Sequence, residues 1–121
     1  MRIALRTDAS GRIGTGHLMR CLTLADTLRA GGARTRFVCR PMPAGLGELV
    51  AGRWHELASL PPGSDAVRAL PDPPHAEWLG ATQADDADAT LAALAGEGTW
   101  DWLVVDHYAL DARWEARLRS V

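Results

Sequence analysis

The chain has 121 residues, of which 47% are hydrophobic and 23% charged, a composition typical of one soluble globular domain. No apolar run approaches the roughly 20 residues that cross a bilayer, and Arg2, Arg6 and Asp8 interrupt any signal peptide at the N-terminus. We therefore expect a cytoplasmic protein with no membrane partner. The net charge of −2 divides into +5 over residues 1–60 and −7 over residues 61–121, but there is no lysine and no alternation of basic and aromatic residues, which argues against nucleic-acid binding.

Strands and helices are predicted to alternate along the first half of the chain. A strand over residues 2–7 leads into a glycine-rich loop, and apolar residues then recur at helical spacing over residues 18–28 until Gly31-Gly32 ends the helix. Residues 34–40 form the next strand and complete a βαβ unit. The two strands of such a unit are almost always parallel.

The second half continues the pattern. The elements predicted there are a short helix at 46–50, a strand at 54–60, a Pro-rich loop at 61–76, a helix at 82–95, a strand at 102–108 and a helix that starts near Asp111. Thr82 is expected to cap its helix, with Asp85 three residues later. The continuous apolar run that starts at Trp102 predicts a buried central strand. The expected fold is α/β, a Rossmann-like parallel sheet flanked by helices in a single domain over residues 1–121.

The segment GRIGTGHLMR, residues 11–20, places three glycines before His17. Its G-x-x-G-x-G spacing differs from the dinucleotide fingerprint G-x-G-x-x-G, and a P-loop requires a lysine that this chain lacks. With Thr15 as N-cap, His17 lies in the first helical turn, where the helix dipole favours an anion and disfavours an imidazolium. A neutral imidazole there can accept a proton from water or a hydroxyl, and Arg20 adds positive potential. The alternative is an ordinary capping or surface histidine.

Asp106, His107 and Tyr108 follow the apolar run of the last predicted strand. Ligands of parallel α/β sheets bind beyond the carboxyl ends of the strands, where this segment and the glycine loop meet. Asp106 can hold a sugar hydroxyl or orient His17, and Tyr108 can hydrogen-bond and stack on a ligand. Alternatively, Asp106 caps a turn and Tyr108 packs on the sheet edge. No zinc-ligand spacing and no G-x-S-x-G motif is present, so we expect neither a metal site nor a serine hydrolase.

Three blocks of the chain resemble one known family. Residues 6–40, RTDASGRIGTGHLMRCLTLADTLRAGGARTRFVCR, closely resemble the start of the UDP-2,4-diacetamido-2,4,6-trideoxy-β-L-altropyranose hydrolases of pseudaminic acid biosynthesis. WLVVDHYALDARWEARLR at residues 102–119 resembles a second block of that family, and AEWLG at residues 76–80 fits a shorter one. The resemblance implies the N-terminal half of a GT-B fold. It also implies release of UDP and free sugar by water attack at the anomeric carbon with inversion, with no cofactor.

The resemblance also implies roles for individual residues. His17 would bind and activate the attacking water as the catalytic residue. The expected substrate-binding residues are Asp8, Gly14, Gly16, Arg20, Asp106 and Tyr108. The family has a second Rossmann-like domain with most of the uridine and diphosphate contacts, so we expect weak binding and little turnover from this chain alone. The alternatives are half of a GT-B glycosyltransferase and a non-catalytic sugar-binding module.

Overall fold

The computed structural model describes residues 1–11, 13–63, 76–96 and 98–119, and it confirms the α/β, Rossmann-like prediction. One sheet of four parallel strands has the order β3-β2-β1-β4. The strands are β1 (Arg2–Thr7), β2 (Arg34–Cys39), β3 (Glu56–Ser59) and β4 (Trp102–Asp106). The helices are α1 (Gly16–Ala30), α2 (Leu46–Gly52), α3 (Gln83–Leu94) and α4 (Ala112–Arg119), with a 3₁₀ helix η1 (Ala76–Leu79). Most of the loop predicted over residues 61–76 lies outside the described residues.

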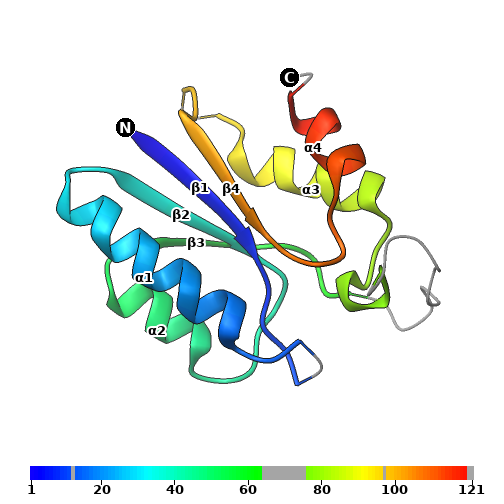
Figure 1. Ribbon diagram of the computed structural model, residues 1–121, viewed down its shortest axis with the longest axis horizontal. Helices are drawn as coiled ribbons and strands as arrows, with labels where there is room; N and C mark the ends of the chain where they lie inside the picture. Colours follow the sequence, from blue (N-terminus) through cyan, green and yellow to red (C-terminus); the bar gives the residue numbers. More distant parts are fainter. Residues whose placement is uncertain (12, 64–75, 97, 120–121) are drawn as a thin grey trace.

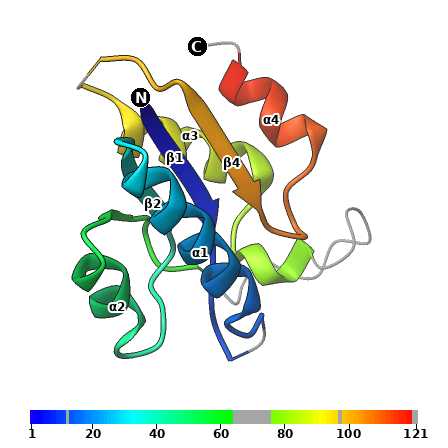
Figure 2. The same cartoon turned by 60° about the vertical axis from the view of Figure 1, so that its left-hand side comes forward.

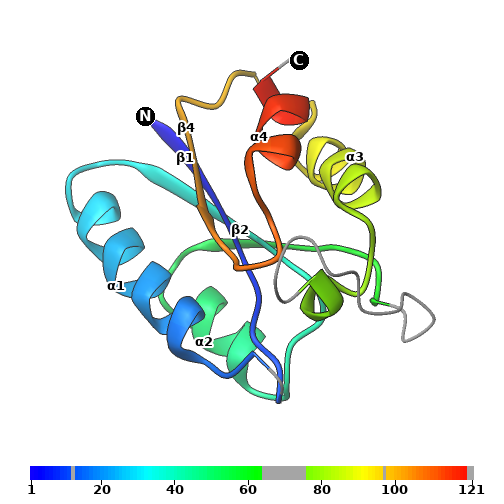
Figure 3. The ribbon, with the colours of Figure 1, turned by 45° about the vertical axis from the view of Figure 1, so that its right-hand side comes forward.

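The helices form one layer on each face of the sheet. Helices α1 and α2 cover one face, and α3 and α4 cover the other (Figures 1 and 3). Because side chains alternate along a strand, Ile3 and Leu5 of β1 pack into the core under α1 and α2, whereas Ala4 packs on the opposite face. Both faces of the sheet are thus covered, which is why its strands are rich in apolar residues.

The ends of the helices follow the sequence signals. Thr82 caps α3, since its hydroxyl accepts a hydrogen bond from the backbone N–H of Asp85 at 3.1 Å. Thr15 occupies the predicted N-cap position of α1, but its side chain makes no capping hydrogen bond. At the other end of α1, Gly32 has a φ of +97°, a left-handed conformation that glycine adopts at little cost. The first helix therefore begins and ends close to where the sequence places it.

The chain reverses its direction across the sheet at β1. From β1 it runs through α1 to β2 and then through α2 to β3, and it afterwards crosses to the far side of β1 to form β4 (Figure 2). Ligands of open parallel sheets bind at such a reversal, beyond the carboxyl ends of the two strands beside it. Here those strands end at Thr7 and Asp106, which are register partners. The topology alone thus predicts a ligand site between the carboxyl ends of β1 and β4.

The prediction of a buried central strand over residues 102–108 is wrong. Strand β4 ends at Asp106 and, within the described part of the chain, pairs only with β1, so it is an edge strand. Trp102 is 64% exposed and the rest of the strand is half-buried. The run is apolar because Val104 packs against the α1 core while Leu103 packs on the opposite face. In a parallel sheet covered by helices on both faces, edge strands and central strands both carry apolar side chains on both faces.

A charged network is enclosed between β1 and the second helical layer. Arg6 is fully buried, and its guanidinium donates to both oxygens of Asp86 on α3, at 3.1 and 2.7 Å, and to both oxygens of Asp8, at 2.7 and 3.1 Å. Asp86 also accepts hydrogen bonds from Trp114 of α4 at 2.9 Å and from Arg40 at 2.7 Å. Burial alone would raise the pKa of Asp86, but the hydrogen bonds from Arg6 and the charges of Arg6 and Arg40 outweigh it and lower that pKa. The network therefore joins β1, the end of β2 and α4 to the ionised carboxylate of Asp86 on α3.

Replacing Asp86 by Asn should test this network. The free energy of unfolding is expected to fall by about 3 kcal/mol, because Arg6 stays buried but loses one of its two counter-charges. Urea denaturation measures the loss. Asp88→Asn is the matched control, since it removes a carboxylate on the same helix whose ion pair with Arg117 is exposed, and it should leave the midpoint nearly unchanged. Equal losses in the two variants would contradict a special role for the buried pair.

Candidate functional site

The candidate site lies where β1 and β4 end, at the reversal of the strand order. After β1 the chain makes a tight loop, in which the N–H of Gly14 donates to the carbonyl of Ser10 at 2.7 Å. Gly14 has a φ of +81°, so a side chain at this position would strain the loop. The loop delivers the chain into α1 with His17 in its first turn, buried to 8% exposure. The sequence prediction for the position of His17 is confirmed.

His17 shares the carboxylate of Asp106 with Arg20. Its Nδ1 lies 2.7 Å from Oδ1 of Asp106, while Nε and Nη2 of Arg20 donate to the two oxygens of that carboxylate, each at 2.7 Å. The Nη2 atom also lies 3.1 Å from Nδ1, so both basic side chains converge on one anion. A lone pair on Nδ1 would face a carboxylate oxygen, so we assign the ring proton to Nδ1. Nε2 then keeps its lone pair and can accept a proton.

Asp106 is an anion in this arrangement. Burial alone would raise its pKa, but the hydrogen bonds from Arg20 and His17 outweigh burial and hold the pKa below its ordinary value of 3.8. The carboxylate is therefore ionised at neutral pH. It can fix the tautomer of His17 and stabilise the imidazolium that forms when Nε2 takes up a proton, as in a catalytic triad.

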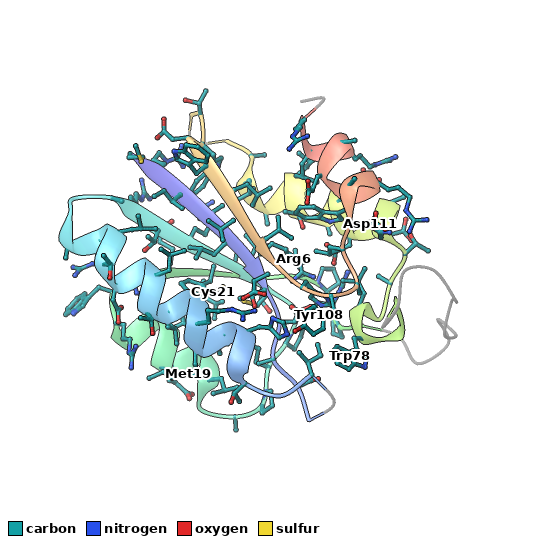
Figure 4. The ribbon with its side chains drawn as sticks, viewed as in Figure 1. Arg6, Met19, Cys21, Trp78, Tyr108 and Asp111 are labelled. Atoms are coloured by element: carbon teal, nitrogen blue, oxygen red, sulfur yellow. The ribbon has the colours of Figure 1, made fainter. Side chains whose placement is uncertain are left out.

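Two aromatic rings continue the site from His17. The ring of Tyr108 meets the imidazole edge to face, with the centroids 4.6 Å apart and the planes at 88°. Trp78 of η1 stacks on the other side, with its ring centroid 6.1 Å from that of Tyr108 and the planes at 30° (Figure 4). Tyr108 is 57% exposed, so the aromatic surface borders solvent beside the histidine. Such a surface suits the apolar face of a sugar ring.

Asp8 belongs to the buried network and is only 4% exposed. One of its oxygens accepts a hydrogen bond from the N–H of Arg40 at 2.8 Å, and the other lies 3.0 Å from Nε2 of His107. Burial would raise its pKa, but the hydrogen bond from His107 and the charge of Arg6 outweigh burial and place the pKa far below the ordinary range. The structure thus gives Asp8 partners inside the protein.

The predicted residues fall into three groups. His17, Arg20, Asp106 and Tyr108 come together, and Asp8 lies in the buried network. Gly14 lies exposed in the loop before α1, and Gly16 is the exposed first residue of that helix. Sequence reasoning assigned no role to His107 and none to Trp78 beyond its place in AEWLG. The only signal for His107 is its position between Asp106 and Tyr108. A strand that ends on three polar residues gives no indication of which one faces the core.

The two cysteines, Cys21 and Cys39, are buried free thiols. Burial raises the pKa of Cys21 to about 11 and that of Cys39 to about 12, so both are neutral at pH 7. The thiol of Cys21 lies 3.8 Å from Oδ2 of Asp106, whereas Nδ1 of His17 contacts Oδ1. It therefore acts as a weak donor to the carboxylate.

Comparisons of the chain with protein-family models, curated proteins and solved structures found no match. Within residues 1–11, 13–63, 76–96 and 98–119, no group of three or more His, Cys, Asp or Glu side chains is arranged to hold a metal ion. In the same ranges no helix combines the length and the apolarity needed to cross a membrane. Function is therefore inferred from the site geometry and from the resemblance of the sequence blocks.

The carboxyl group of Asp106 should titrate below its ordinary pKa of 3.8. Because the pKa is depressed in the folded state, the contribution of this group to stability is complete above the unfolded pKa and is lost as the pH falls through the folded pKa. Carboxyl ¹³C NMR over an acid titration measures this midpoint, and Arg20→Gln should raise it. A midpoint at or above 3.8 in the unmodified chain would contradict the assigned contacts.

Proposed function

We propose that this chain forms the sugar-side half of a UDP-sugar hydrolase, which cleaves a UDP-linked 2,4-diacetamido-2,4,6-trideoxyhexose to UDP and free sugar. The observation that supports a general base is the hydrogen bond from Nδ1 of His17 to Asp106, which leaves Nε2 as an acceptor at the carboxyl edge of the sheet. The substrate class comes from the resemblance of residues 6–40 and 102–119 to the hydrolases of pseudaminic acid biosynthesis.

In the proposed reaction, Nε2 of His17 accepts a proton from water while the water oxygen bonds to the anomeric carbon. The bond from that carbon to the diphosphate oxygen breaks, its electron pair leaves with UDP, and the configuration inverts. Asp106 stabilises the imidazolium, and the histidine then returns its proton to solvent. A positioned general base contributes about 10²- to 10⁴-fold to the rate of such a step.

The charges around the site suit a diphosphate leaving group. The first turn of α1 carries backbone N–H groups without helical partners, and the helix dipole is positive at this end. Gly14 just before that turn and Gly16 at its start are both exposed, so a ligand can approach the backbone there. Both nitrogens that Arg20 directs at Asp106 are engaged, so we assign Arg20 to holding the carboxylate and adding positive potential.

In the proposed enzyme, a second domain makes most of the contacts to the nucleotide. In the family that the chain resembles, a second domain holds most of the uridine and diphosphate, so we place the water and sugar sites here and the nucleotide contacts in that domain. The free thiols of Cys21 and Cys39 fit a cytoplasmic location for the reaction. No step in the proposal requires a metal or another cofactor.

Binding to the chain itself can be measured by a ¹⁵N NMR titration with the UDP-sugar and, separately, with UDP. We expect shifts at His17 and Tyr108 with the sugar nucleotide and few there with UDP, because these two side chains form the sugar subsite. Gly14 and Gly16, beside the diphosphate, should shift most with the sugar nucleotide. Equal shifts at His17 and Tyr108 with both ligands would contradict the division of the substrate between two domains. An absence of shifts with either ligand would argue against a sugar site in this chain.

Catalysis can be tested by single turnover in ¹⁸O-water with the chain in excess over substrate. We expect ¹⁸O in the free sugar, and we expect His17→Ala to slow its release by about 10²- to 10⁴-fold without loss of fold. Label in UDP would mean attack at phosphorus and would overturn the mechanism. Transfer to an added acceptor would favour a glycosyltransferase, and binding without turnover, even with a second domain supplied, would favour a non-catalytic module.

The dependence of His17 on Asp106 gives a separate test. Asp106→Asn should slow turnover by about 10²-fold, because an amide can donate to Nδ1 and stabilise the opposite tautomer. The double variant with His17→Ala should be no slower than His17→Ala alone, since both changes disable one unit. Multiplicative losses in the double variant would show that the two residues act independently.

A further inference from the structure

We propose that His107 is a positioning residue, whose hydrogen bond to the buried carboxylate of Asp8 holds Asp106 and Tyr108 against His17. Its role in catalysis rests on the proposed function. Its effect on the geometry of His17 does not, and it can be measured without any turnover. Three features of the structure support this role: the tautomer of His107, its place between two site residues, and the several hydrogen bonds that hold Asp8.

Both ring nitrogens of His107 have partners within the protein. Nδ1 accepts a hydrogen bond from the backbone N–H of Ala109 at 3.0 Å, so the ring proton is on Nε2. Nε2 then donates to Oδ2 of Asp8 at 3.0 Å. The side chain is 1% exposed, and the N–H of Leu110 donates to the carbonyl of His107 at 3.2 Å. The imidazole thus links the turn after β4 to the end of β1.

Asp106 and Tyr108 lie on either side of His107 in the sequence. Successive side chains at the end of a strand point to opposite faces, so His107 reaches the buried network while its two neighbours reach His17. The carboxylate of Asp106 lies 2.7 Å from Nδ1 of His17, and the ring of Tyr108 lies 4.6 Å from the imidazole. A backbone rotation that releases His107 from Asp8 must therefore also move both contacts to His17.

Asp8 is a rigid anchor for this turn. Arg6 donates to both of its oxygens, at 2.7 and 3.1 Å, and the N–H of Arg40 adds a bond of 2.8 Å. Arg6 is held in turn by Asp86 of α3, which also binds Trp114 of α4. Enclosing such charges is costly and contributes little net stability compared with apolar packing. Groups in a catalytic site must be held within about 0.5 Å of their productive positions. We assign to the network the role of holding Asp8 with that precision.

Two substitutions separate the two hydrogen bonds of His107. The side-chain oxygen of Asn occupies the place of Nδ1, so His107→Asn keeps the acceptor for Ala109 but does not reach Asp8. The amide of Gln occupies the place of Nε2, so His107→Gln keeps the donor to Asp8 and loses the acceptor for Ala109. If the bond to Asp8 positions the site, Gln should restore the geometry of His17 and Asn should not.

The readout is the ring ¹⁵N and ¹H NMR spectrum of His17 in the full chain. We expect the Nδ1–H signal in the unmodified chain and in His107→Gln, and its loss in His107→Asn, where the contact to Asp106 loosens. Asp26→Asn is the control, because it changes another His–Asp pair, between Nε2 of the buried His55 and the exposed Asp26 at 2.8 Å, and should leave His17 unchanged. The same spectrum of the unmodified chain should show His107 as the Nε2–H tautomer.

An unchanged His17 signal in folded His107→Asn would overturn the proposal, as would equal loss of that signal in both variants. Should the variants fail to fold, an Nδ1–H tautomer of His107 in the unmodified chain would still overturn it, and the opposite tautomer would support it. In single turnover, His107→Asn should lower the rate about tenfold, since a misplacement of about 1 Å costs up to about 10²-fold. A chain with no hydrolysis and the expected NMR pattern would refute only the proposed function.

Discussion

The guanidinium of Arg6 lies between the carboxylates of Asp8 and Asp86, which are far apart in the sequence, and much of the architecture follows from this contact. Arg6 is fully buried. Removing its charge from water costs free energy, which only nearby counter-charges can offset. Asp86 supplies one of them from α3, and Trp114 ties α4 to the same carboxylate. The second helical layer is therefore fixed over β1 by charge as well as by packing. Strand β4, which joins α3 to α4, follows them to its place beside β1.

The same pairing explains the division of charge along the sequence. Part of the positive charge of the first half is neutralised by carboxylates of the second half, since Arg6 and Arg40 pair with Asp86 while Arg20 pairs with Asp106. These arginines are consequently committed to carboxylates of the protein. The excess of positive charge in the first 60 residues is thus a weak argument for an anionic ligand. The N-terminus of α1, with its exposed glycine loop, is the better one.

Periodicity and turn signals were sufficient to predict the order and type of the elements, and the glycine loop placed His17 correctly in the first turn of α1. The edge position of β4 could not be predicted, because Leu103 and Val104 pack on opposite faces as they would in a central strand. The role of Asp8 was also inaccessible, since its environment depends on Arg6 and on a histidine 99 residues away. Local patterns carry no information about ion pairs formed at such separations.

Two His–Asp pairs lie on either side of the end of β4, and they differ in the nitrogen that carries the proton. His107 uses both nitrogens for contacts within the protein, so it cannot take up a proton without releasing the N–H of Ala109. His17 gives only Nδ1 to its carboxylate and keeps the lone pair of Nε2. The first arrangement is suited to holding a backbone turn in place, and the second to moving a proton. Asp106 and His107 are consecutive residues at the end of β4, so under our proposal the hydrogen bond from His107 to Asp8 determines how precisely Asp106 is placed against His17.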